Sequence, residues 1–180
     1  EASTSDKVQL IQTSDLVDRM RAAKSREEMA HLQRAIEIAD EALDEVSPTI
    51  RPGMTEAQVS WELEKAMRER GAESVSFETI VGAGVNGALP HHRPDDTVIA
   101  EGQPVVIDMG ATYEGYCSDL TRTIFVGEPD DTFRKVYGTV LRAQLAAEEQ
   151  VRVGMTGQET DAISRDIIAE AGYGEYFGHS

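Results

Sequence analysis

The chain has 180 residues, of which 40% are hydrophobic and 28% charged, as is usual for a globular protein of about one domain. Its formal net charge of −16 argues against nucleic-acid binding, because no basic stripe is available to contact phosphates. The one cysteine, Cys117, excludes an internal disulfide and fits a reducing compartment. No apolar run approaches the length of a membrane-spanning helix, so we expect a cytoplasmic protein with no membrane contact.

The first 22 residues look like a connecting segment rather than a domain. They begin with polar residues, and Val8, Leu10 and Ile11 could form one short strand. We interpret residues 1–22 as a connector or as the tail of a preceding N-terminal domain. Residues 23–180 are then predicted to be part of one domain.

Two amphipathic helices are expected next, each opened by a capping box. Ser25 with Glu28 begins the first helix. Thr55 with Gln58 begins the second. His31 lies beside the apolar stripe of the first helix and is expected to be solvated or half-buried. Spacings of three and four predict the residues that face the core: Met29, Leu32, Ile36, Ala39, Leu43 and Val46 in the first helix, and Val59, Leu63, Ala66 and Met67 in the second.

Strand-like segments predicted from residue 75 to 81 and a loop with three glycines lead into the segment PHHRP at 90–94. The loop lacks the Lys-Ser/Thr pair that follows a phosphate-binding loop, so it does not indicate nucleotide binding. Within PHHRP, His92 is expected to be an exposed loop histidine.

The segment 104–123 predicts a β-hairpin that carries two aspartates. An apolar run, Val105–Ile107, continues into Asp108, a turn rich in Tyr and Gly follows, and the chain returns from Asp119. The carboxylates lie eleven positions apart on opposite arms, so both could converge on one divalent cation. The alternative of two solvated turn aspartates stays open from spacing alone.

A third helix is expected from about 132 to 150, and the turn after it repeats an earlier one. The hexapeptide IRPGMT at 50–55 returns as VRVGMT at 151–156, so each residue number rises by 101. The same step takes the helix-ending Gly71 to Gly172, which indicates two related halves. Only the first half is followed by predicted strands, so we expect the second half to be incomplete in this chain.

Four segments together resemble the pita-bread metallopeptidases, and within them the Xaa-Pro aminopeptidase and Xaa-Pro dipeptidase branch. They are PHHRP at 90–94, VVIDMGA at 105–111, SDLTRT at 118–123 and FGHS at 177–180. The resemblance covers residues 15–180. It implies an α+β pita-bread fold with two pseudo-symmetric halves, and residues 23–180 as a partial catalytic domain.

By this resemblance, Asp108 and Asp119 are ligands in a centre of two divalent metal ions, with manganese favoured and cobalt or zinc as alternatives. His91 matches a catalytic histidine that touches the substrate. Thr121 matches a threonine whose hydroxyl orients a ligating carboxylate. His179 matches a histidine of the active-site wall, and the other ligands would follow the last residue.

The implied activity is release of the N-terminal residue from Xaa-Pro dipeptides, or from peptides with proline in second position, by water activated at the metal ions. The complete protein is expected to be a homodimer, and the 180-residue piece alone is expected to be inactive. Two alternatives stay open: a non-catalytic pita-bread domain that binds proteins, and a metal-free creatinase-like hydrolase. The retained acidic pair and His91 disfavour both, since a pure scaffold has no need of two costly carboxylates.

Overall fold

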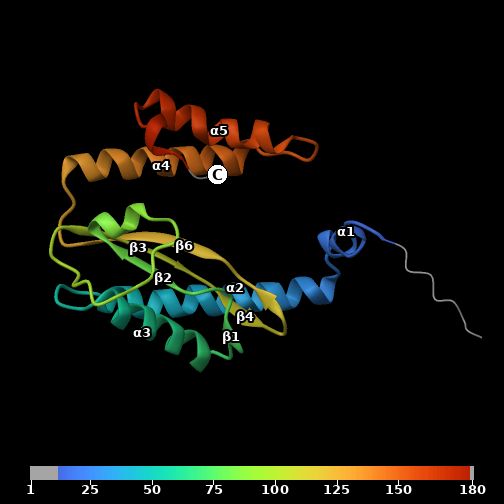
Figure 1. Ribbon diagram of the computed structural model, residues 1–180, viewed down its shortest axis with the longest axis horizontal. Helices are drawn as coiled ribbons and strands as arrows, with labels where there is room; N and C mark the ends of the chain where they lie inside the picture. The colour runs from blue at the N-terminus through green and yellow to red at the C-terminus, as the bar shows by residue number, and fades with distance from the viewer. Residues whose placement is uncertain (1–11, 179–180) are drawn as a thin grey trace, which may run out of the picture.

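The computed structural model describes residues 12–178 and arranges them as a layer of strands between two pairs of helices (Figure 1). The helices are α1 (Leu16–Ala22), α2 (Arg26–Val46), α3 (Glu56–Glu69), α4 (Asp131–Gln150) and α5 (Gly157–Glu170), with short 3-10 turns η1 (Ser47–Thr49), η2 (Gly84–Ala88) and η3 (Gly174–Tyr176). The strands are β1 (Ser74–Val75), β2 (Ile80–Ala83), β3 (Gln103–Met109), β4 (Ala111–Tyr113), β5 (Tyr116–Cys117) and β6 (Leu120–Val126). The strand suggested at residues 8–11 lies outside the described residues. None of the helices within 12–178 is both long and apolar enough to span a membrane.

Both predicted capping boxes are confirmed. At the start of α2, the Ser25 hydroxyl accepts a hydrogen bond from the Glu28 N–H, and the Glu28 carboxylate accepts one from the Ser25 N–H. Thr55 and Gln58 make the same reciprocal pair at the start of α3. Each helix therefore begins where its side chains satisfy backbone donors that have no partner inside the helix.

The predicted inward stripe is confirmed for α3 but only in part for α2. Met29 and Ile36 are 50% and 39% exposed, so their predicted burial is wrong. The face of α2 that the sheets cover is rotated by about one residue position from the predicted stripe. Its buried residues are Ala35, Ile38, Ala39, Ala42, Leu43 and Val46. Periodicity finds an apolar stripe, but the packing partner decides which edge of the stripe is covered.

The strands form two three-stranded antiparallel sheets in the orders β1-β4-β5 and β2-β3-β6. One long hairpin contributes to both, because β3 pairs with β6 in one sheet while β4 pairs with β5 in the other. On β3, Val105, Ile107 and Met109 are fully buried in the core with α2 and α3. The alternate residues Val106 and Asp108 therefore face the other side of the sheet.

The predicted repeat is confirmed in the backbone. Gly53 and Gly154 have φ of 93° and 98°, and Gly71 and Gly172 have φ of 100° and 86°, a left-handed region that favours glycine. Thr156 also opens α5 with a capping box, as Thr55 opens α3. The α4–α5 pair lies on the opposite side of the central sheet from α2 and α3 (Figure 1).

Candidate metal and substrate site

Asp108 lies on the sheet face that is turned away from α2 and α3. The register of β3 and β6 places it directly opposite Thr121, so the two side chains share that face. The Thr121 hydroxyl donates a hydrogen bond of 2.7 Å to Oδ1 of Asp108. The predicted partnership of this threonine and this carboxylate is thus present in the geometry.

Asp119 immediately precedes β6, where the two arms of the hairpin approach closely, and its charge acts on Asp108. A Cβ atom at Gly110 would lie 2.0 Å from the backbone oxygen of Ser118, so only glycine fits there. The Ser118 hydroxyl also accepts the N–H of Ala111 at 2.9 Å, which ties the two arms beside the aspartates. A larger residue at 110 would force the two arms apart.

The electrostatics of this acidic pair suit a cation. Burial raises the pKa of the Asp108 carboxyl above its ordinary value, the charge of Asp119 raises it further, and the Thr121 hydrogen bond opposes both. A divalent ion between the carboxylates would favour the ionised form and reverse the two unfavourable effects. The donor set of two carboxylates fits a hard or borderline metal ion.

His91 borders the same hollow as Asp108 and Thr121, on the loop that follows η2. The rest of this hollow is formed by Ile80, Asn86, Gly87, Leu89, Pro90 and Val106. The structure therefore brings together His91 and Asp108, which lie seventeen positions apart in the sequence. A histidine at this edge is placed to reach a molecule that lies against Asp108.

The prediction for His92 is wrong. Its side chain is only 10% exposed, and its Nε2 lies 2.6 Å from Oε2 of Glu56, which is fully buried. Sequence reasoning missed Glu56, because an acidic residue in the first turn of a helix is ordinarily a solvated one. Nothing local in the sequence signals its burial, which arises because the loop after β2 folds over the start of α3.

Within residues 12–178, no three His, Cys, Asp or Glu side chains gather in a metal-binding group. The other predicted site histidine, His179, lies outside the described residues.

Comparison with known proteins identifies relatives over nearly the whole chain. The model of metallopeptidase family M24 matches residues 30–180. An uncharacterized peptidase of Bacillus subtilis, YqhT, is 44% identical over 172 residues, which are 96% of this chain and 49% of that protein. The Xaa-Pro dipeptidase of Pyrococcus horikoshii is 45% identical over 166 residues, or 92% of this chain and 47% of that protein.

Solved structures give the same result for the fold. The Xaa-Pro dipeptidase from Bacillus anthracis superposes with a TM-score of 0.91 at 50% identity, covering 93% of this chain and 47% of that one. The prolidase from Pyrococcus furiosus gives 0.89 at 44% identity, with coverages of 92% and 49%. The predicted α+β pita-bread class is confirmed, and the chain spans about half the length of the relatives it matches.

Proposed function

Since the chain belongs to metallopeptidase family M24, we propose that the complete protein is a metal-dependent exopeptidase acting on Xaa-Pro substrates. It would release the N-terminal residue from Xaa-Pro dipeptides or from longer peptides with proline in second position. Identity of 44–45% to two Xaa-Pro dipeptidases supports this proposal. The observation that carries it is the hollow in which Asp108, Thr121 and His91 meet, beside Asp119.

Asp108 and Asp119 are the proposed protein ligands of two divalent metal ions, with manganese first and cobalt or zinc as alternatives. When bound, such ions supply Lewis acidity, which polarises a peptide carbonyl and acidifies water. Thr121 holds one oxygen of Asp108 at 2.7 Å and so restricts the rotation of that carboxylate. A carboxylate held in this way meets a cation with little rearrangement.

His91 is the proposed catalytic residue of the described part of the site. Its side chain borders the hollow from the loop side, whereas Asp108 borders it from the sheet. From there it would donate a hydrogen bond to the substrate carbonyl, whose oxygen gains negative charge during attack by water. The loop thus binds and orients the peptide, while the sheet holds the groups that bind cations.

The remaining assignments extend the same proposal. Residues 23–180 would be part of the catalytic domain and residues 1–22 a connector or the tail of a preceding domain. His179 would form part of the active-site wall. The complete protein would be a cytoplasmic homodimer with peptide substrates and without nucleic-acid or membrane partners.

Replacement of either aspartate in the complete protein tests the proposal. Asp108→Asn and Asp119→Asn should each lower Xaa-Pro cleavage by about 100-fold or more and reduce bound metal, because a neutral amide is a poor ligand for a hard cation. Asp44→Asn, an exposed aspartate on α2, serves as the matched control. Unchanged cleavage and metal content in the two site variants would disprove the proposal.

A further inference from the structure

A buried carboxylate that takes no part in the acidic pair lies at the first position of α3. Glu56 is 0% exposed. Its Oε1 accepts the backbone N–H of Ala83 at 2.7 Å and the side-chain amide of Asn86 at 3.0 Å. Its Oε2 lies 2.6 Å from Nε2 of His92. Both oxygens are therefore occupied by groups from one segment, residues 83–92.

These contacts are costly to arrange and are not needed to begin the helix. A carboxylate removed from water is unfavourable unless it is fully hydrogen-bonded. Capping of α3 is already provided by Thr55 and Gln58. Glu56 instead connects the helix to the loop, and its backbone N–H donates to the carbonyl of Thr97 at 3.0 Å. The segment that begins at β2 and returns at residue 97 is thus held at several points along its length by one residue.

The segment held by Glu56 is the one that carries His91. His92 is the next residue in the chain, so anchoring its ring fixes the backbone within one Cα–Cα step, about 3.8 Å, of His91. Asn86, the other side chain on Glu56, itself borders the hollow that His91 shares with Asp108. The geometry of the loop side of the site therefore depends on a carboxylate outside it.

We infer that Glu56 and His92 are positioning residues for His91: their buried pair fixes the loop that presents His91 to the hollow containing Asp108 and Thr121. This inference rests on the proposed function. Glu56 does not border the hollow, so it acts on the hollow through the groups that it holds, chiefly the side chains of His92 and Asn86. On the sheet side of the site, the hydrogen bond from Thr121 to Asp108 joins β6 to β3 and involves no group that Glu56 contacts.

The chain offers a matched control one residue further along the loop. Arg93 Nε lies 3.2 Å from Oε2 of Glu78, but these side chains are 81% and 63% exposed. The His92–Glu56 pair and the Arg93–Glu78 pair each join a loop side chain to a glutamate, but only the first pair is buried. An exposed pair contributes little, so Glu78→Gln should leave the loop as it is.

The test uses the complete protein and measures amide hydrogen exchange together with kcat and KM for an Xaa-Pro dipeptide. Glu56→Gln and His92→Phe should speed exchange at least tenfold in residues 84–97 and leave β6 unchanged. They should lower kcat by about 10- to 100-fold, with a smaller change in KM, because a misplaced catalytic group costs rate rather than binding. His92→Gln, which keeps an N–H donor, should restore part of the protection, and Glu78→Gln should match the wild type within twofold.

Two outcomes would overturn the inference: exchange that rises equally in all elements, or a loosened loop with unchanged kcat. If Glu56→Gln does not fold, the two His92 variants decide the question. If the wild-type protein cleaves no Xaa-Pro peptide, the proposed function fails. The NMR signals of the His91 ring then decide the inference separately, since they should broaden in His92→Phe and not in Glu78→Gln.

Discussion

The two helix pairs share a local design and differ in what covers them. In both pairs a long helix, a glycine turn and a capped second helix occur at the same spacing. Yet α2 and α3 bury six and five residues, whereas α4 and α5 bury only two and one. Capping and turn formation are thus local properties, while burial requires a sheet against the helix.

The exposed side of α4 makes this difference concrete. Tyr137, Val140, Leu141 and Leu145 are between 42% and 52% exposed. Tyr137, Val140 and Leu141, but not Leu145, border a groove that also includes Asp119 and the first residues of β6. The apolar faces of α2 and α3 pack against the sheets, whereas the apolar face of α4 stays exposed beside the candidate site.

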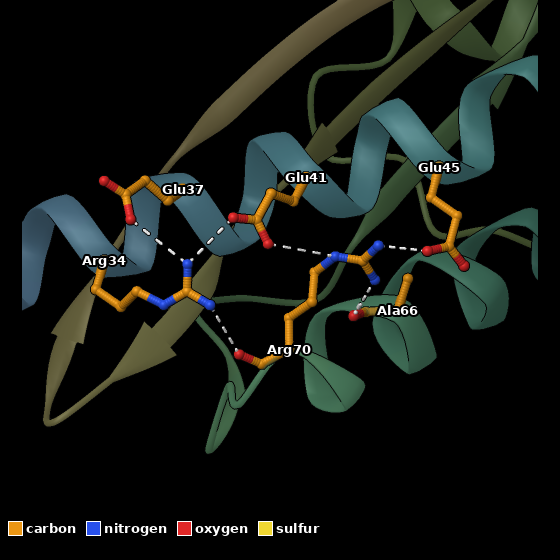
Figure 2. A network of polar contacts seen from close by, with 6 residues as sticks. All are labelled: Arg34, Glu37, Glu41, Glu45, Ala66 and Arg70. Atoms are coloured by element: carbon orange, nitrogen blue, oxygen red, sulfur yellow. Dashed lines mark hydrogen bonds and ion pairs between the residues drawn. The ribbon is translucent and has the colours of Figure 1, made fainter.

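Ion pairing between the helices also differs. In the first pair, two arginines and three glutamates join α2 to the end of α3. Figure 2 shows the arginine side chains lying between the helices. The network consists of Arg34, Glu37, Glu41, Glu45 and Arg70, with the carbonyl of Ala66. A step of 101 takes the arginines to Lys135 and Ala171, so the network is not repeated. Instead, the Ser164 hydroxyl donates to the carbonyl of Ala143 at 3.1 Å.

The largest predicted effect comes from a charge placed at equivalent positions of the two long helices. Ala39 is 1% exposed, and its counterpart Val140 is 51% exposed. Ala39→Glu should cost about 3 kcal/mol or more of unfolding free energy, because an unpaired carboxylate would enter the core. Val140→Glu should change stability by about 0.5 kcal/mol or less. Urea unfolding of the 180-residue chain measures both, and equal losses would contradict the comparison.

A truncation in the second helices should give an intermediate effect. Leu63 is fully buried in α3, and the matching position in α5 is Ser164. Leu63→Ala should cost about 2–5 kcal/mol through lost contacts and a cavity. Ser164→Ala should cost about 0.5–1.5 kcal/mol, the usual contribution of one hydrogen bond. Thermal unfolding followed by circular dichroism gives the order, and a larger loss for the serine would refute the explanation by burial.

Removal of the ion network should have a smaller effect. Arg70→Met deletes the contacts to Glu41 and Glu45 and should cost about 1 kcal/mol, because the guanidinium is largely covered while the glutamates face solvent. The loss should shrink at high salt. Arg134→Met removes one exposed pair with Glu128 and is the control, with about 0.5 kcal/mol or less expected. Salt-independent losses of equal size would count against a role for the network.

The smallest effect concerns the glutamates of two capping boxes. Hydrogen bonds to the Ser25 backbone and to the Tyr116 hydroxyl lower the pKa of Glu28, and bonds to the Thr156 backbone and hydroxyl lower the pKa of Glu159. A group whose pKa is lower in the folded state than in the unfolded state stabilises the folded protein when the pH is above the unfolded pKa, which is about 4.5 here. That contribution is lost as the pH falls through the folded pKa.

Glu28→Gln should therefore lower Tm slightly at pH 7, by more than Glu159→Gln does, because only Glu28 also accepts the Tyr116 hydroxyl, at 2.9 Å. Both differences should shrink at an acidic pH below the folded pKa values of the two glutamates. Gln58 already fills the same position in α3, so the box itself survives the change. Melting curves at the two pH values provide the measurement, and a difference that persists in acid would exclude a charge effect.

Much of the site could be predicted from the sequence because its signals are local. Strand formers around a glycine-bearing turn predict the hairpin, and the Asp108 and Asp119 positions on its arms follow from that prediction. No local pattern points to His91, and its predicted role depends on the resemblance of PHHRP to a known family. The prediction of an exposed His92 fails because its partner Glu56 lies 36 positions away and only the folded loop brings the two side chains together.

The helix starts, the left-handed glycines, the hairpin and the repeat can be read from the amino-acid sequence, since each depends on side chains within a few residues of one another or on matching segments. Packing between distant segments sets which edge of α2 is covered, leaves room only for glycine at 110 beside the Ser118 carbonyl, and buries Glu56 against the loop of His91. These outcomes depend on surfaces that meet across long chain separations. Burial and distance between such surfaces are properties of the packed molecule, and no local pattern encodes them.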